Sequence, residues 1–307
     1  MSVSYPSLSA TSVSPTKTDE LTSYLATAEE VARAAGKMIR EAHDARELGK
    51  GSVAGLESKG SVATETVDLV TATDKACEDL IIGTIKERFP DHAFIGEESS
   101  FTGPGGGPPN GPLELSDTPT WIIDPLDGTT NFVHGYPLVT VSIGLAVGKK
   151  LVLGVVYNPL MDELCSAVTG RGTHLNGRRV HVGTATGVTT ALVCNNIGAS
   201  RNPEVNATAT RRLLALLQAN IRGLRNSGSA AQNMMHVACG RLDAYFEDGF
   251  GGPWDVAAGH VLIEEAGGIC AHHLGGPFQL MAGKGQVLCG NKAVVEDIAR
   301  VLKSVEQ

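Results

Sequence analysis

The residues with the clearest chemical potential are two carboxylates, Asp124 and Asp127, in the segment WIIDPLDGTTNF. Pro125 fixes its own φ and favours an extended Asp124, while Gly128 permits a tight bend. If Thr129 then opens a helical turn, the N–H groups of Gly128 and Thr129 point outward and can seat a phosphate. Two carboxylates beside a phosphate-binding turn would repel the phosphate unless cations lie between them. That arrangement is found in metal-assisted phosphatases.

Three further acids stand at the ends of expected elements: Asp74, Glu97 and Asp255. Each has an ordinary explanation when taken alone. Asp74 and Asp255 could be N-caps of the helices that follow them, and Glu97 could be a solvated strand-end charge beside Glu98. Magnesium, however, requires hard oxygen ligands, several of them carboxylates. Together with the Asp124 turn, these acids therefore predict a Mg²⁺ site.

Two other phosphate-handling motifs are excluded by spacing. Phosphatases that form a phosphoaspartate use Asp-x-Asp-Gly-Thr, whereas Pro125 and Leu126 both separate the acids here. The Gly-Lys-Gly segment at 283–285 is not a P-loop, because Lys284 precedes glycine rather than serine or threonine.

The helices and strands that must position these residues are predicted from the spacing of apolar residues and from the glycines and prolines that end each element. Apolar residues at helical spacing predict a long helix from Leu21 to about Ala42, and β-rich runs at 138–147 and 151–157 predict a hairpin. Early antiparallel strands followed by alternating strands and helices indicate mixed α/β and α+β character, a layered αβαβα sandwich with two sheets between helix layers. Further strands are expected at 67–71, 93–96, 163–168, 191–195, 221–225, 242–246, 269–271 and 286–290, and further helices at 75–88, 207–219, 228–239, 255–266 and 291–303.

The expected domain plan is a disordered leader at 1–19 followed by a single domain at 20–303. Its first half, 20–185, is the expected metal-binding α+β half. It contains two loop insertions, one at 45–60 that is rich in glycine and serine and one at 101–117 that is rich in glycine and proline. Its second half, 186–303, has the α/β pattern.

Composition limits the partners. A net charge of −8 argues against nucleic acid, and no run approaches the roughly 18 apolar residues of a membrane helix. The N-terminus lacks the basic and apolar regions of a signal peptide. Six cysteines without a C-x-x-C pair predict neither a zinc site nor a disulfide framework. A cytoplasmic location is therefore expected.

With these motifs in hand, the chain resembles the inositol monophosphatase family, which belongs to the Mg²⁺-dependent, lithium-sensitive phosphatases. The resemblance covers about residues 20 to 303. It rests on five segments in the family's order: DLVTATD (68–74), FIGEES (94–99), WIIDPLDGTTNFVHGYP (121–137), GVVYNP (154–159) and WDVAAGHVLIEEAGG (254–268).

The resemblance implies a role for each matching residue. Two to three Mg²⁺ ions would be held by Glu97, Asp124, Asp127 and Asp255 and by the backbone carbonyl of Leu126. Glu97, Thr129 and Asp74 would be catalytic, with Thr129 hydrogen-bonded to Asp74 so that the pair orients and deprotonates the attacking water. The substrate would contact Gly128, Thr129, Gly228, Ser229, Ala230 and Glu247.

The implied activity is hydrolysis of inositol monophosphate, or a close polyol phosphate, by a metal-activated water in a homodimeric enzyme that lithium inhibits. A sugar phosphate, histidinol phosphate or a nucleotide bisphosphate remains an alternative substrate on the same metal core. A ligand-binding relative without activity is disfavoured, because every metal-binding position is filled. The short spacing from Glu247 to Trp254 and Asp255 favours the monophosphatase branch.

Overall fold

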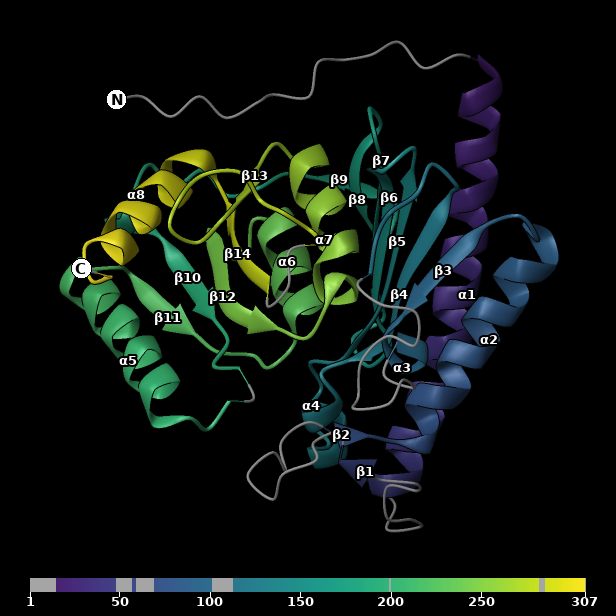
Figure 1. Cartoon of the computed structure of the whole chain (residues 1–307), viewed down its shortest axis with the longest axis horizontal. Helices are drawn as coiled ribbons and strands as arrows, with labels where there is room; N and C mark the ends of the chain where they lie inside the picture. Colours follow the sequence, from purple (N-terminus) through teal and green to yellow (C-terminus); the bar gives the residue numbers. More distant parts are fainter. Residues whose placement is uncertain are drawn as a thin grey trace.

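The computed structural model describes residues 15–47, 57–58, 69–100, 113–198, 200–281 and 285–306. Figure 1 shows five layers: an outer helix pair, a sheet, a central helix pair, a second sheet and a second outer helix pair. This arrangement confirms the predicted αβαβα sandwich.

The first sheet has seven strands, in the order β3-β4-β5-β6-β7-β8-β9. Only β3 and β4 run parallel, and every other neighbouring pair is antiparallel. One face is covered by α1 (Pro15–Glu47) and α2 (Ala72–Arg88). The strands are β3 (Ala93–Gly96), β4 (Thr120–Asp127), β5 (Thr140–Val147), β6 (Lys150–Asn158), β7 (Glu163–Val168), β8 (Gly172–Leu175) and β9 (Arg178–Val180).

The helical spacing that predicted α1 is also what packs it. Its fully buried residues recur every three or four positions and form one apolar stripe against β5 and β6. These residues are Ala28, Val31, Ala32, Ala35 and Ile39.

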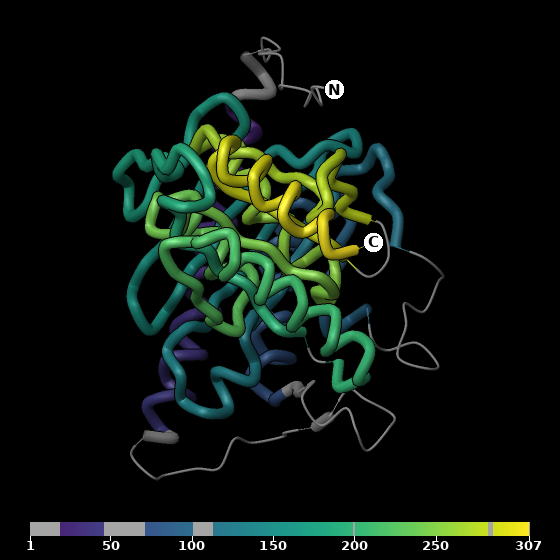
Figure 2. Tube along the Cα trace, turned by 90° about the vertical axis from the view of Figure 1, so that its left-hand side faces the viewer, coloured from purple at the N-terminus to yellow at the C-terminus, as the bar shows by residue number. Residues whose placement is uncertain are grey.

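The second sheet has five strands, in the order β11-β10-β12-β14-β13. Figure 2, from the side, shows α5 (Pro203–Gln218) and α8 (Lys292–Lys303) crossing its outer face. Strand β10 pairs in parallel with both neighbours, and the pairs made by β14 are antiparallel. The strands are β10 (Leu192–Asn195), β11 (Gly223–Arg225), β12 (Ala244–Phe250), β13 (Ile269–Ala271) and β14 (Gly285–Gly290).

The central layer consists of α6 (Ala230–Ala238) and α7 (Pro253–Glu265), which join the two sheets. Helix α7 lies against β5 and β6 at two glycines. A Cβ at Gly154 would stand 2.3 Å from the carbonyl oxygen of Ala258, and one at Gly144 would stand 2.9 Å from the Cβ of Ala257. The missing side chains therefore allow α7, from the second half of the chain, to reach the first sheet.

Several sequence boundaries were wrong. Helix α1 begins at Pro15 and ends at Glu47. Residues 15–19 of the expected leader and residues 45–47 of the expected 45–60 loop are therefore helical. The rest of the leader lies outside the described residues, as do 101–112 and all of 48–60 except β1 (Glu57–Ser58). Sequence reasoning also missed β8 and β9, which are too short for an alternating pattern to stand out. The remaining elements are β2 (Leu69–Val70), α3 (Glu97–Ser100), α4 (Thr129–His134) and the 3₁₀ turn η1 (Val188–Thr190).

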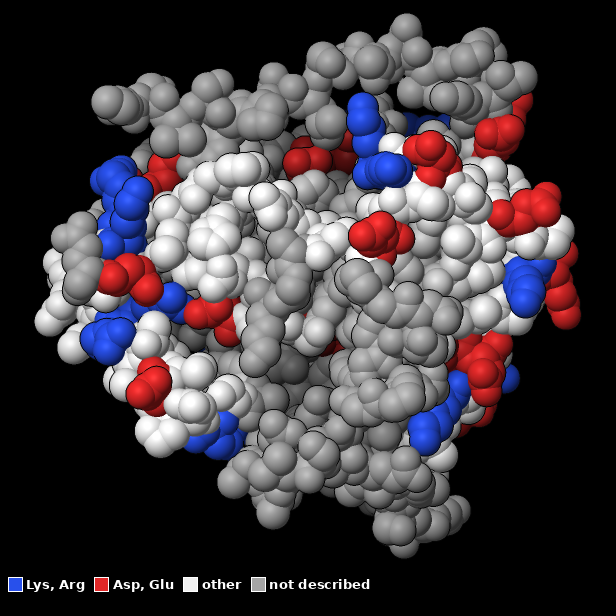
Figure 3. Space-filling model, in the orientation of Figure 1, with Lys and Arg blue, Asp and Glu red and all other residues white. Residues whose placement is uncertain are grey.

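Charge on the described surface is mixed in sign. On the face in Figure 3, the Lys and Arg side chains are interspersed with Asp and Glu rather than gathered into one basic field. Among the helices of the described residues, none combines the length and apolar character needed to cross a membrane.

Candidate metal and substrate site

A bulge in β4 brings Asp124 and Asp127 to the site. Asp124 lies opposite Ser142 and Asp127 opposite Thr140, so three steps along β4 match two along β5. In a regular strand, residues three apart point to opposite faces; the extra residue breaks that alternation. The bend is closed by the N–H of Leu126, which donates to Asp124 Oδ1 at 3.0 Å. Both carboxylates are buried.

The start of α6 holds the Asp127 carboxylate. Its Oδ2 accepts hydrogen bonds from the Ser229 hydroxyl at 2.6 Å and the Ala231 N–H at 2.7 Å, and the Ala230 N–H reaches Oδ1 at 3.3 Å. Ser229 is also the N-cap of α6, where its Oγ accepts from the N–H of Gln232. In this arrangement Ser229 and Ala230, which we predicted as substrate contacts, orient an acid of the candidate metal site, and their contact with substrate stays a prediction.

Asp74 and Thr129 are joined as the resemblance implied. The Thr129 hydroxyl lies 3.1 Å from Asp74 Oδ1 and 3.2 Å from the carbonyl oxygen of Leu126. The N-cap explanation for Asp74 is wrong, because Thr71 is the N-cap of α2. Asp74 is the third helical residue of a capping box, in which its Oδ2 accepts from the Thr71 N–H at 3.0 Å. The helix start therefore fixes one carboxylate oxygen and leaves the other for Thr129.

Glu97 opens α3 directly after β3, the parallel neighbour of β4. A buried acid on α2, Glu78, accepts the backbone N–H groups of Glu98 at 2.9 Å and Ser99 at 2.8 Å, and so fixes this helical turn. Burial raises the pKa of Glu78. The sequence analysis missed Glu78, although it stands four residues after Asp74, the spacing that places two side chains on one helix face.

Asp255 reaches the site from the second half of the chain. It is the third residue of α7, whose N-cap is Gly252 and whose first residue is Pro253, so the N-cap explanation is wrong here too. Its Oδ2 accepts the Gly251 N–H at 2.7 Å.

The acids raise one another's pKa. Burial, followed by the charges of Glu97, Asp127 and Asp255, raises the pKa of Asp124 well above its ordinary value. Burial, followed by the charges of Asp127 and Glu97, does the same for Asp255. Burial raises the pKa of Asp127 to about 6 despite its three donors. Carboxylates gathered at a largely buried place are costly in their ionised form unless a positive charge compensates them.

In the part of the chain that the structure describes, no cationic side chain supplies that charge to the three aspartates. In the described part of the chain, no Lys, Arg or His forms an ion pair with Asp124, Asp127 or Asp255. No three His, Cys, Asp or Glu side chains among these residues close around a single ion either. Magnesium does not need such a cage, because it keeps several waters and is held by one or two carboxylates together with phosphate oxygens. The donor set therefore fits Mg²⁺.

A second group of residues consists of Asn196, directly after β10, and Tyr245 and Glu247 within β12. Glu247 is buried, its Oε2 accepts from Asn196 Nδ2 at 3.1 Å and from the Tyr245 hydroxyl, and burial raises its pKa to about 7. Glu247 is therefore not a solvated surface acid. Asn196 was missed, because its contact with Glu247 depends on the parallel pairing of β10 with β12, which no local pattern reveals. Tyr245 was missed although it stands two residues before Glu247 on β12, the spacing that places two side chains on one face of a sheet.

Comparison with known proteins places this chain in a family. The model of the "Inositol monophosphatase family" matches residues 20–307. The chain is 47% identical to "Inositol monophosphatase 2" of Solanum lycopersicum over 82% of its length and 88% of the relative's. It is 42% identical to "Inositol monophosphatase 1" of Bos taurus, over 80% and 85%.

A solved structure agrees. The inositol monophosphatase from Anabaena (Nostoc) sp. PCC 7120 superposes with a TM-score of 0.74 at 32% identity, over 93% of this chain and 97% of that one. The sequence matches and the shared fold lead to one conclusion: this chain belongs to the inositol monophosphatase family.

Proposed function

We propose that this phosphatase hydrolyses inositol monophosphate, or a close polyol phosphate, to the free polyol and phosphate with the help of Mg²⁺. The observation that carries the proposal is the cluster of acids contributed by β4, α3 and α7, in which burial and the charges of Glu97, Asp127 and Asp255 raise the pKa of Asp124. No cationic side chain is paired to Asp124, Asp127 or Asp255 in the described part of the chain. The comparisons support the phosphatase class and the polyol.

Five residues would hold the ions: Glu97, Asp124, Asp127 and Asp255 by their carboxylates, and Leu126 by its backbone carbonyl. When bound, Mg²⁺ polarises phosphate oxygens and lowers the pKa of water. The Ser229 hydroxyl and the Ala231 N–H both donate to Asp127 Oδ2, whereas Oδ1 receives the longer contact from the Ala230 N–H, so Oδ1 is the oxygen better placed to face an ion.

The Thr129–Asp74 pair would handle the proton. Because the Thr129 hydroxyl donates toward Asp74 Oδ1, its own lone pairs can accept a hydrogen from the attacking water and so orient it. Asp74 is the base that can take up the proton through Thr129, and the Thr71 capping contacts hold it in place. The chain therefore contributes orientation and proton transfer to an in-line displacement at phosphorus.

Phosphate release tests the proposal, measured with Mg²⁺ against inositol 1-phosphate, galactose 1-phosphate, histidinol phosphate and a nucleotide bisphosphate. We expect the highest kcat/KM for inositol 1-phosphate and loss of turnover when EDTA removes Mg²⁺. Higher kcat/KM for the nucleotide bisphosphate would overturn the proposed substrate, and full turnover in EDTA would overturn the proposed metal.

A further inference from the structure

The Glu247 carboxylate uses only one of its two oxygens within the protein. Both of its donors, Asn196 Nδ2 at 3.1 Å and the Tyr245 hydroxyl, reach Oε2. Burial and the charge of Glu247 raise the pKa of Tyr245, so this phenol keeps its proton and donates. Among the described residues, no donor lies within hydrogen-bond distance of Oε1. That oxygen is left for a hydroxyl group of a ligand.

The orientation of the Asn196 amide is fixed by its partners. Its Oδ1 accepts the backbone N–H of Gly228 at 3.1 Å and Asn233 Nδ2 at 3.2 Å. A backbone N–H can only donate, so Oδ1 must face Gly228 and Nδ2 must face Glu247. Reversing the amide would place two donors together and two acceptors together.

The loop that contains Gly228 is in turn held against α4, the helix whose first turn is predicted to bind the phosphate. Gly228 has φ +83, a left-handed conformation that favours glycine, and a Cβ there would stand 2.9 Å from Asn131 Oδ1. Asn131, on α4 just after Thr129, donates through Nδ2 to the carbonyl oxygens of Leu138 at 2.7 Å and Ser227 at 2.8 Å. Asn196 thus connects the loop beside α4 to the Glu247 carboxylate.

We propose that Asn196 is a positioning residue for polyol recognition, which with Tyr245 holds Glu247 Oε2 and turns Oε1 toward a ring hydroxyl of the substrate. This inference deepens the proposed function and rests on it. A substrate without hydroxyl groups gains little from Oε1, so the contribution of Asn196 depends on the alcohol part of the substrate.

The test compares Asn196→Asp with the wild type on two substrates: inositol 1-phosphate, and p-nitrophenyl phosphate, which has no hydroxyl groups. Aspartate keeps the acceptor for the Gly228 N–H but replaces the donor to Glu247 with a repelling charge. The expected result is a rise in KM for inositol 1-phosphate of about tenfold or more. The expected fall in kcat/KM for p-nitrophenyl phosphate is less than about threefold.

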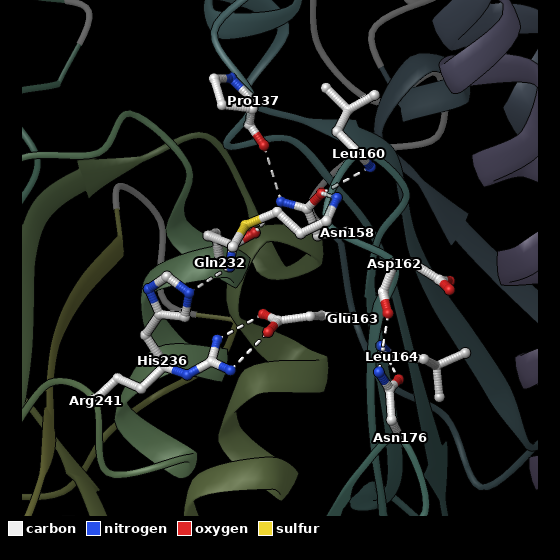
Figure 4. Close-up of polar contacts among 11 residues, drawn as sticks. Pro137, Asn158, Leu160, Asp162, Glu163, Leu164, Asn176, Gln232, His236 and Arg241 are labelled. Carbon is white, nitrogen blue, oxygen red and sulfur yellow. Dashed lines mark hydrogen bonds and ion pairs between the residues drawn. The ribbon is translucent and has the colours of Figure 1, made fainter.

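A matched control is available at Asn176, in the turn between β8 and β9, whose contacts are drawn in Figure 4. Asn176 Oδ1 accepts the Leu164 N–H at 2.8 Å, and its Nδ2 donates to the Asp162 carbonyl at 2.9 Å. Asn176→Asp therefore also keeps the side-chain acceptor and removes the side-chain donor of an amide that contacts two neighbouring backbone groups. Its KM for inositol 1-phosphate should stay within about twofold of the wild-type value, since the lost contact does not touch the substrate.

Tyr245→Phe provides a second variant that removes one donor to the same oxygen with little change in shape. It should raise KM for inositol 1-phosphate by about threefold to tenfold. Equal losses on both substrates, or an unchanged KM in both Asn196→Asp and Tyr245→Phe, would overturn the inference while leaving the proposed function in place. A wild-type enzyme that does not hydrolyse inositol 1-phosphate would overturn the proposed function and this inference together.

Discussion

The Thr129 hydroxyl lies 3.1 Å from Asp74 Oδ1, although 55 residues separate the two along the chain. The capping box of α2 holds Asp74, and the turn after β4 presents Thr129. Thr129→Val removes the hydroxyl while nearly keeping the volume, and should lower kcat by about 10² to 10⁴ with a smaller change in KM. Thr129→Ser should retain most of the activity. Steady-state kinetics on inositol 1-phosphate measure both.

Thr169→Val is the control for that substitution, because the Thr169 hydroxyl donates to the Val152 carbonyl away from the site. Its kcat should match the wild-type value. A Thr129→Val enzyme with unchanged kcat would remove Thr129 from the proton path.

Replacing Asp255 with asparagine should separate stability from activity. The charges of Asp127 and Glu97 raise the pKa of Asp255, so its carboxylate is repelled in the metal-free protein. Asp255→Asn removes that repulsion, and the metal-free variant should melt higher than the wild type by a few degrees, about 2–5 °C. Turnover should fall at least about a hundredfold, because an ion loses a ligand.

Thermal melts with and without Mg²⁺ measure this effect. The wild type should gain melting temperature with Mg²⁺ and the variant should gain much less. An Asp255→Asn protein that gains as much as the wild type would show that Asp255 holds no ion.

Stability without metal should fall as pH rises. Burial raises the pKa of Asp127 from 3.8 to about 6, and the pKa values of Asp124 and Asp255 are raised well above their ordinary value. Between the unfolded and folded pKa values the native state binds more protons than the unfolded state, so the free energy of unfolding decreases with rising pH. In EDTA, the melting temperature should therefore be higher near about pH 5 than near about pH 8.

Mg²⁺ should reverse this trend, because protons compete with the ion for the same carboxylates. The Mg²⁺-induced rise in melting temperature should be larger at about pH 8 than at about pH 5. Asp124→Asn should flatten the pH dependence in EDTA. A metal-free wild type that gains stability from pH 5 to pH 8 would contradict the assignment of these shifts.

Gly154→Ala should destabilise the protein, since the new methyl group would meet the Ala258 carbonyl oxygen at 2.3 Å. Relieving the clash requires α7 to move away from β6, at an expected loss of about 1–3 kcal/mol in the free energy of unfolding. Mg²⁺ affinity should fall as well, because Asp255 moves with α7.

Gly83→Ala is the matched control, because a Cβ at Gly83 in α2 meets nothing within 4 Å. That substitution should raise the free energy of unfolding by about 0.5–1 kcal/mol, since alanine is the better helix former. Urea unfolding measures both variants, and equal stability in the two would refute the close packing of α7 on the sheet.

Local patterns predicted much of this protein, and long-range pairing accounts for the rest. The apolar stripe of α1 and the acidic turn after β4 are both visible in short windows. The capping box around Asp74 was also readable, since Thr71 stands three residues before the acid, although the N-cap considered for this helix was Asp74 itself. Asn196 could not be found this way, because its role arises where β10 meets β12 and the Gly228 loop.

Asp255 shows the same limit. The sequence marks the start of a helix there, but only the two glycines of β5 and β6 explain why that helix reaches the other acids. The close packing of α7 on the sheet depends on the missing side chains of these two glycines, and two isolated glycines produce no periodic pattern in the sequence.

The extra residue in β4 makes this site sensitive to length rather than to side-chain chemistry. Substituting Leu126 with another apolar residue keeps its carbonyl and the spacing of the acids. Deleting it would restore an unbroken ladder with β5 and leave one residue between the two acids, so that strand alternation alone would place them on one side. Two carboxylates can thus be placed on the same side of the sheet in two ways. One is a bulged strand with two residues between them, and the other is a regular strand with one residue between them. A single-codon deletion, which changes no acid, would replace the first arrangement with the second and remove the Leu126 carbonyl from between the two acids.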